Sequence, residues 1–136
     1  MTRQEKYPDT DTFHFYNANP KGRITGDCRI RAICTALEVP YKDIVMELAE
    51  IQCETGYDQC ENHGISILMK RHGWIKHAQP RKPDNTKYTG KEFCRLHRSG
   101  RIYAHVGGRH SVAIVDGKIW DIWDSTDGCI GNYWTK

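Results

Sequence analysis

The sequence lacks any long apolar run. No stretch approaches the ~20 apolar residues that a membrane helix needs, and residues 1–11 are polar, without the apolar centre of a secretory signal peptide. These absences predict a soluble protein with no membrane partner. Internal repeats and low-complexity tracts are also missing. We therefore predict that the 136 residues form a single domain with one core, preceded by a loosely ordered arm at residues 1–12.

The sequence also lacks a Cys-x-x-Cys pair, although it contains six cysteines. Without a signal peptide, free thiols in a reducing cytosol are a better interpretation than a disulfide framework, so we predict a cytoplasmic protein. A zinc site remains a minor alternative, because its possible ligands are irregularly spaced: Cys53, Cys60, His63, and either His72 or His77. We predict no metal and no cofactor.

Charge of one sign is not in large excess, since the formal net charge is only +3. Basic residues gather between Lys76 and Lys87, but no aromatic side chains alternate with them, so nucleic acid is not a favoured partner. Pro80 and Pro83 lie in the same polar stretch, which predicts a solvated loop there.

Apolar residues at helical spacing predict three helices in the first half of the chain. The first begins at Cys28 and ends before Pro40, the second continues to about Glu54, and the third ends at Gly73. A fourth, short helix begins after Thr89, where Thr-Gly-Lys-Glu has the pattern of a capping box.

Strands are predicted mainly in the second half of the chain. Asp116-Gly117 is a strong signal for a two-residue hairpin turn, and helices followed by a β-meander indicate an α+β fold. The predicted strands are Phe13–Tyr16, Trp74–Ile75 at an edge, Ile102–Val106, Ser111–Val115 and Lys118–Trp123.

Cys28 follows a Gly-Asp turn and begins a helix, so its thiol would lie at a helix N-terminus. First-turn amides and the helix dipole favour the thiolate, which is the nucleophilic form. Far downstream, His110 opens the hairpin, and the hairpin ends near aspartates. The order Cys, His, Asp predicts a nucleophile, a general base and an orienting carboxylate.

Two aspartates compete to orient His110. An ideal two-residue turn at Asp116-Gly117 places Asp121 on the same face as His110 and Asp124 on the opposite face. A single bulge or a longer loop reverses this assignment. Asp124 lies just past the strand end beside His110, so we prefer Asp124, with Asp121 as the second choice.

An oxyanion would need a donor in addition to the backbone amide of Cys28. Asn17 and Asn19 carry the nearby side-chain amides, and each could equally shape a turn. Asp27 is expected to cap the helix. Arg31, one turn later, either offsets the charge of Asp27 or pairs elsewhere in the core.

These motifs resemble a small papain-like cysteine peptidase domain, similar in layout to the double-glycine leader peptidases of bacteriocin exporters and to NlpC-type amidases. Gly26-Asp27-Cys28 corresponds to the nucleophile segment and 110–115 to the histidine strand. Asp124-Ser125 corresponds to the Asn-Ser or Asp-Pro of papain-like enzymes, which further favours Asp124. The segments 17–28 and 120–125 also resemble parts of small phage and Gram-positive bacterial proteins.

The resemblance implies a papain-like fold, with N-terminal helices packed on a C-terminal antiparallel sheet, and a peptide or protein substrate. Papain-like enzymes usually carry an oxyanion glutamine six residues before the cysteine, where this chain has Gly22, so Asn19 or Asn17 would replace it. The predicted function is a cysteine peptidase, isopeptidase or amidase. Because transglutaminases share the residue order, transfer to an amine remains open.

The alternative function is that of a catalytically weak or inactive papain-like scaffold that binds phage or host proteins. Aromatic residues near the C-terminus would then form the binding surface: Trp120, Trp123, Tyr133 and Trp134.

Overall fold

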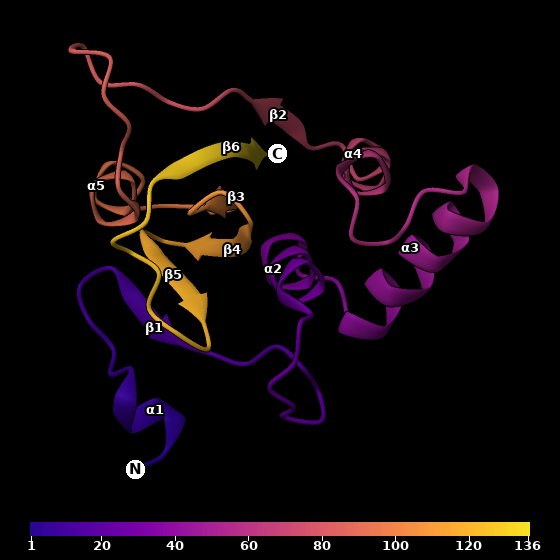
Figure 1. The fold of residues 1–136 in the computed structure, drawn as a ribbon, viewed down its shortest axis with the longest axis horizontal. Coiled ribbons are helices and arrows are strands. Elements are labelled where there is room, and N and C mark those ends of the chain that lie inside the picture. Colours follow the sequence, from indigo (N-terminus) through magenta and orange to yellow (C-terminus); the bar gives the residue numbers. More distant parts are fainter.

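A six-stranded sheet forms the centre of the fold, with helices on both of its faces (Figure 1). The structure is a computed structural model that describes all of residues 1–136. The elements in chain order are α1 (Arg3–Lys6), β1 (Phe13–Phe15), α2 (Cys28–Leu37), α3 (Tyr41–Thr55), α4 (Asn62–Arg71), β2 (Ile75–His77), α5 (Gly90–Leu96), β3 (Arg101–Val106), β4 (His110–Val115), β5 (Lys118–Asp121) and β6 (Ile130–Thr135). The α+β class predicted from the sequence is confirmed.

The sheet has the strand order β1-β5-β4-β3-β6-β2 and is mixed. β1 pairs in parallel with β5, whereas all other neighbours are antiparallel. The expectation of a C-terminal antiparallel sheet is therefore corrected, because the sheet is mixed and includes β1 and β2 from earlier in the chain. Strand β6 was not predicted from the sequence, because Gly131 and Asn132 interrupt its β-forming residues.

The hairpin between β4 and β5 has the tight turn that the sequence predicts. Val115 pairs with Lys118, and Ala113 pairs with Trp120. Asp116 and Gly117 both have positive φ, at 48° and 79°, as the two central residues of a type I′ turn require. The register is therefore free of a bulge between the turn and Ala113.

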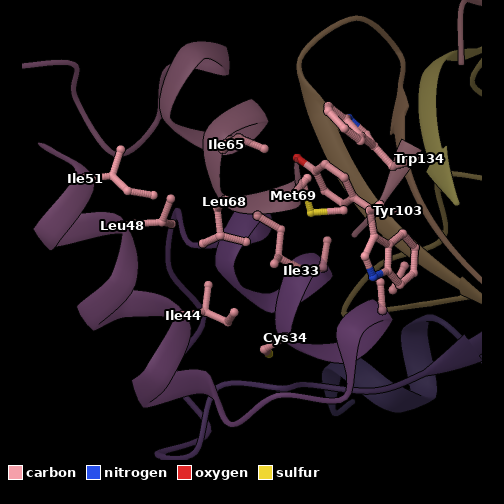
Figure 2. Packing of buried hydrophobic residues seen from close by; sticks show 14 residues of the cluster. Ile33, Cys34, Ile44, Leu48, Ile51, Ile65, Leu68, Met69, Tyr103 and Trp134 are labelled. Atoms are coloured by element: carbon pink, nitrogen blue, oxygen red, sulfur yellow. The ribbon is translucent and has the colours of Figure 1, made fainter. Parts of the chain in front are cut away.

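The sheet divides the buried apolar side chains into two clusters, where the sequence analysis expected one core. Alternate residues of β3 point to opposite faces, so Tyr103 belongs to one cluster and Ile102 to the other. Figure 2 shows the first cluster, to which α2 contributes Ile33, α4 contributes Leu68 and β3 contributes Tyr103. The second cluster packs Phe93 of α5 against the other face.

Helix α2 lies between the sheet and α3, and it packs against β4 (Figure 1). Its buried positions include Ile33 and Ala36, which lie on one helix face at i and i+3. The helix ends at Leu37 because Glu38 adopts a left-handed conformation, with φ of 57°. This packing holds the first turn of α2 beside the start of β4.

Residues 1–12, predicted as an arm, contact the rest of the chain at several points. A capping box between Thr2 and Glu5 begins α1, and the Arg3 Nε donates a hydrogen bond of 2.7 Å to the Ile122 carbonyl. Farther along, Asp11 accepts a hydrogen bond from Arg98. These contacts, which join residues far apart in the chain, attach the arm to the domain. No helix of the structure combines the length and the apolar character needed to cross a membrane.

Candidate active site

Cys28 is the first residue of α2, as predicted, and its half-buried thiol lines a small pocket. Burial opposes ionisation of this thiol, but interactions with the His110 ring and the Ser111 backbone outweigh the burial. The positive charge of Arg31 acts in the same direction. The pKa of Cys28 is consequently lowered from its ordinary value, which favours the thiolate.

His110 begins β4 and interacts with both Cys28 and Asp121. Its Nε2 lies 2.5 Å from the Asp121 Oδ2, which leaves Nδ1 as the ring nitrogen for the thiol. Burial lowers the pKa of His110, but the carboxylate and the thiol outweigh burial and raise it to about 9. The Trp123 ring covers the imidazole, with ring centroids 4.8 Å apart.

Asp121 ends β5 and is almost completely buried, with 2% of its surface exposed. Its Oδ1 accepts hydrogen bonds from the Arg31 Nη1 at 2.6 Å and from the Ile122 amide at 2.7 Å. Its Oδ2 faces His110. Each carboxylate oxygen therefore has a fixed partner, and the ring of His110 is held in one orientation.

Arg31 joins Asp121 to a second buried carboxylate, that of Asp27. The Arg31 Nε donates to the Asp27 Oδ1 at 2.8 Å. Asp27 does not cap α2 with its side chain, contrary to the expectation, because Arg31, Tyr41 and Asn19 occupy its two oxygens. Burial and the Asp27 carboxylate together raise the pKa of Tyr41 to about 12.

Asp124, the preferred orienter, forms no hydrogen bond or ion pair with the His110 ring. Its Oδ1 accepts hydrogen bonds from the amide and the hydroxyl of Thr126. The carboxylate that reaches His110 belongs to Asp121, because the hairpin keeps the ideal register and β5 ends at that residue. The preference for Asp124 as the partner of His110 is therefore corrected to the second choice, Asp121.

Asn17 and Asn19 shape the loop before α2. The Asn17 Nδ2 donates to the Arg23 carbonyl, and its Oδ1 accepts from the Asn19 amide. The Asn19 Nδ2 donates to Asp27, and its Oδ1 accepts from the Lys21 amide. The turn-forming interpretation of both residues therefore fits the structure better than the oxyanion interpretation.

Gln59 lines the same small pocket as Cys28, a position that the sequence analysis missed. It lies in the connection between α3 and α4, far from Cys28 in the chain. Arg29 brings this connection to the start of α2 by donating hydrogen bonds to the Cys60 carbonyl and to Asn62. No local sequence pattern signals such a contact.

All six cysteines are free, in agreement with the prediction of free thiols. Cys34 and Cys94 are buried, and burial raises the pKa of Cys94 to about 12. The cysteines and histidines of the minor zinc alternative are not brought together, since no group of three or more His, Cys, Asp or Glu side chains is placed to hold a metal ion.

The C-terminal aromatic residues do not form one surface. Trp134 is buried in the first cluster, Trp120 packs on His14, and Tyr133 stacks on His77. Only Trp123 lies at the candidate site. Comparisons of the chain with protein-family models, with curated proteins and with solved structures gave no match.

Proposed function

We propose that this chain is a thiol-dependent acyl-transfer enzyme, a cysteine peptidase, isopeptidase or amidase, with a papain-like arrangement of its α+β fold. Cys28 is the proposed nucleophile, His110 the general base and acid, and Asp121 the orienter. The observation that carries this proposal is the position of the His110 ring between the Cys28 thiol and the Asp121 carboxylate.

The opposite pKa shifts of Cys28 and His110 support a thiolate paired with an imidazolium. The thiolate attacks the carbonyl carbon of an amide and forms a tetrahedral oxyanion. The His110 imidazolium then gives its proton to the leaving amine, the C–N bond breaks, and a thioester to Cys28 remains. Neutral His110 next takes a proton from water, whose hydroxide attacks the thioester and releases the acid and the thiolate.

Two groups near Cys28 could stabilise the oxyanion. The backbone amide of Cys28 belongs to the first turn of α2, where amide groups have no partner within the helix. Gln59, which shares the pocket with the thiol, replaces Asn17 and Asn19 as the proposed side-chain donor. Both donors would act most strongly on the negative charge that develops in the transition state.

Site-specific alkylation tests the proposal. Iodoacetamide should label Cys28 faster than exposed Cys53 at about pH 6, because a lowered pKa increases the ionised, reactive fraction of the Cys28 thiol. Buried Cys94, with a pKa of about 12, should react slowest. Mass spectrometry of peptides from the native protein after short labelling measures each rate.

His110→Gln should remove the faster labelling of Cys28. The control His14→Gln, which changes a partly exposed histidine beside Asp9, should keep it. Equal labelling of Cys28 and Cys53 in the unaltered protein would contradict the proposal. Once a substrate is found, acylation should weaken above about pH 9, because His110 then loses the proton that the leaving amine needs.

A further inference from the structure

A polar cleft of about 640 Å³ lies beside the candidate active site, and the proposed mechanism makes no use of it. Nine residues line it, among them Asn62 at the start of α4, His105 of β3 and Asn132 of β6. Lys87 contributes from the chain between β2 and α5, which passes along β6 (Figure 1).

The cleft begins one strand away from the nucleophile. His105 pairs with Ser111 across β3 and β4, and the Ser111 backbone interacts with the Cys28 thiol. Neighbouring strands lie about 5 Å apart. Gly107 lines both this cleft and the smaller cavity that contains His110. A peptide whose carbonyl lies at Cys28 could therefore reach the cleft with a neighbouring side chain.

Gly131 of β6 lines the cleft without a side chain. A Cβ atom at Gly131 would lie 3.5 Å from the His105 Cβ, an ordinary contact distance, and the φ of Gly131 is not positive. Neither backbone strain nor a close approach therefore requires glycine there. A larger side chain at this position would instead take up space within the cleft.

The charge on the residues that line the cleft is positive. The residues that line it include Lys87 and no aspartate or glutamate. Arg29 binds the side chain of Asn62 at its rim, and neither Arg29, Lys76 nor Lys87 forms an ion pair. Burial lowers the pKa of His105, and the charges of Arg29 and Lys76 lower it further. A neutral His105 and two side-chain amides would donate hydrogen bonds to an anion there.

We propose that this cleft binds an acidic side chain of the peptide or protein substrate, next to the bond that Cys28 attacks. The inference rests on the proposed acyl-transfer function, because it takes Cys28 as the point where the substrate is fixed. Lys87 is the specificity-determining residue, since it is the only lysine or arginine among the residues that line the cleft.

Matched covalent probes test the substrate preference. We would use acetylated tripeptide vinyl sulfones that carry glutamate or glutamine at one position in turn and measure the rate at which each labels Cys28. At one position the glutamate probe should react about threefold to tenfold faster than the glutamine probe, as partly exposed charge pairs allow. Added salt should reduce this preference.

Lys87→Gln should abolish the preference for glutamate, and the matched control Lys42→Gln, on the exposed side of α3, should retain it. Equal rates for glutamate and glutamine at every position, or a preference that survives in Lys87→Gln, would overturn the inference while leaving the proposed function intact.

A binding measurement separates the cleft from the chemistry. In Cys28→Ala, N-acetylglutamate amide should shift the NMR signals of His105 and Asn132, and N-acetylglutamine amide should shift them less. If the glutamate compound binds but Cys28 is unreactive in the unaltered protein, the proposed function is overturned. The cleft would then still be an anion-binding site. The absence of any difference between the two compounds would overturn the inference.

Discussion

The hydrogen-bond partners of Asp121 determine its place in the candidate site. One of its oxygens accepts from Arg31 and the Ile122 amide, while the other faces His110. The guanidinium compensates the charge of the buried carboxylate, which would otherwise be costly to desolvate. Asp124, only three positions later, accepts hydrogen bonds from Thr126 through its Oδ1 and forms none with the imidazole. The two carboxylates therefore have different roles in this site.

Exchanging each aspartate for asparagine distinguishes these roles. Asp121→Asn should lower the rate of Cys28 alkylation at about pH 6 by about tenfold or more, because an amide does not stabilise the imidazolium as a carboxylate does. Asp124→Asn should leave the rate within about twofold. Site-resolved mass spectrometry measures both rates, and circular dichroism checks that each variant is folded. A larger loss in Asp124→Asn than in Asp121→Asn would restore Asp124 as the orienter.

At the scale of elements, α2 is the part that joins the helices to the sheet. Its first turn carries Cys28 and Arg31, and Arg31 reaches Asp121 at the end of β5. Near its end, the Thr35 carbonyl accepts a hydrogen bond of 2.7 Å from Arg101 of β3. Contacts at both ends of α2 therefore hold the thiol at a set position relative to the hairpin that supplies His110.

Removing the guanidinium of Arg31 should strongly destabilise the packing of α2 against the sheet. Arg31→Met leaves the two buried carboxylates of Asp27 and Asp121 without their cation, so the free energy of unfolding should fall by about 3–5 kcal/mol. The control Arg71→Met removes an ion pair whose partners are about half exposed, and it should cost about 0.5 kcal/mol or less. Urea unfolding followed by circular dichroism gives both values. Similar losses in the two variants would contradict the structural role of the buried network.

At the scale of the whole molecule, the site forms where the helical layer packs against the sheet. Cys28 comes from the helical layer, and His110 and Asp121 come from the sheet. The cluster between these layers includes Leu68 and Tyr103, which are fully buried (Figure 2). The pKa of Cys28 should therefore return to its ordinary value when this cluster unfolds.

Urea should have opposite effects on two cysteines at about pH 6. Labelling of Cys28 should slow as unfolding returns its pKa to the ordinary value, while labelling of Cys94 should accelerate as it becomes exposed. Both changes should follow one midpoint, measured by quenched labelling and mass spectrometry.

Leu68→Ala should move that midpoint to lower urea through a loss of about 2–5 kcal/mol. The matched change Met46→Ala, at an exposed position of α3, should shift stability by about 0.5 kcal/mol or less. If Cys28 keeps its fast labelling beyond the unfolding of Leu68→Ala, its reactivity does not depend on the folded site.

Local signals predicted much of the secondary structure. The periodic apolar residues placed α2, α3 and α4, the Thr89 capping box began α5, and Asp116-Gly117 set the hairpin register. The two elements that the sequence did not predict, β6 and α1, have physical explanations. β6 contains Gly131 and Asn132 and is stabilised by pairing with β3 and β2, which no local pattern reveals. Helix α1 is too short to show a periodic face.

The sequence by itself determined that Cys28 begins a helix and that His110 opens a hairpin, because turn and capping chemistry act over a few residues. Only the tertiary structure decided which carboxylate reaches the imidazole. Asp121 and Asp124 are equally acidic in sequence, and the choice depends on where β5 ends and where Arg31 lies. The position of Gln59 beside Cys28 and the cleft beside His105 likewise depend on packing between segments that are distant in the chain. The free energy of this packing cannot be read from any single stretch of the sequence.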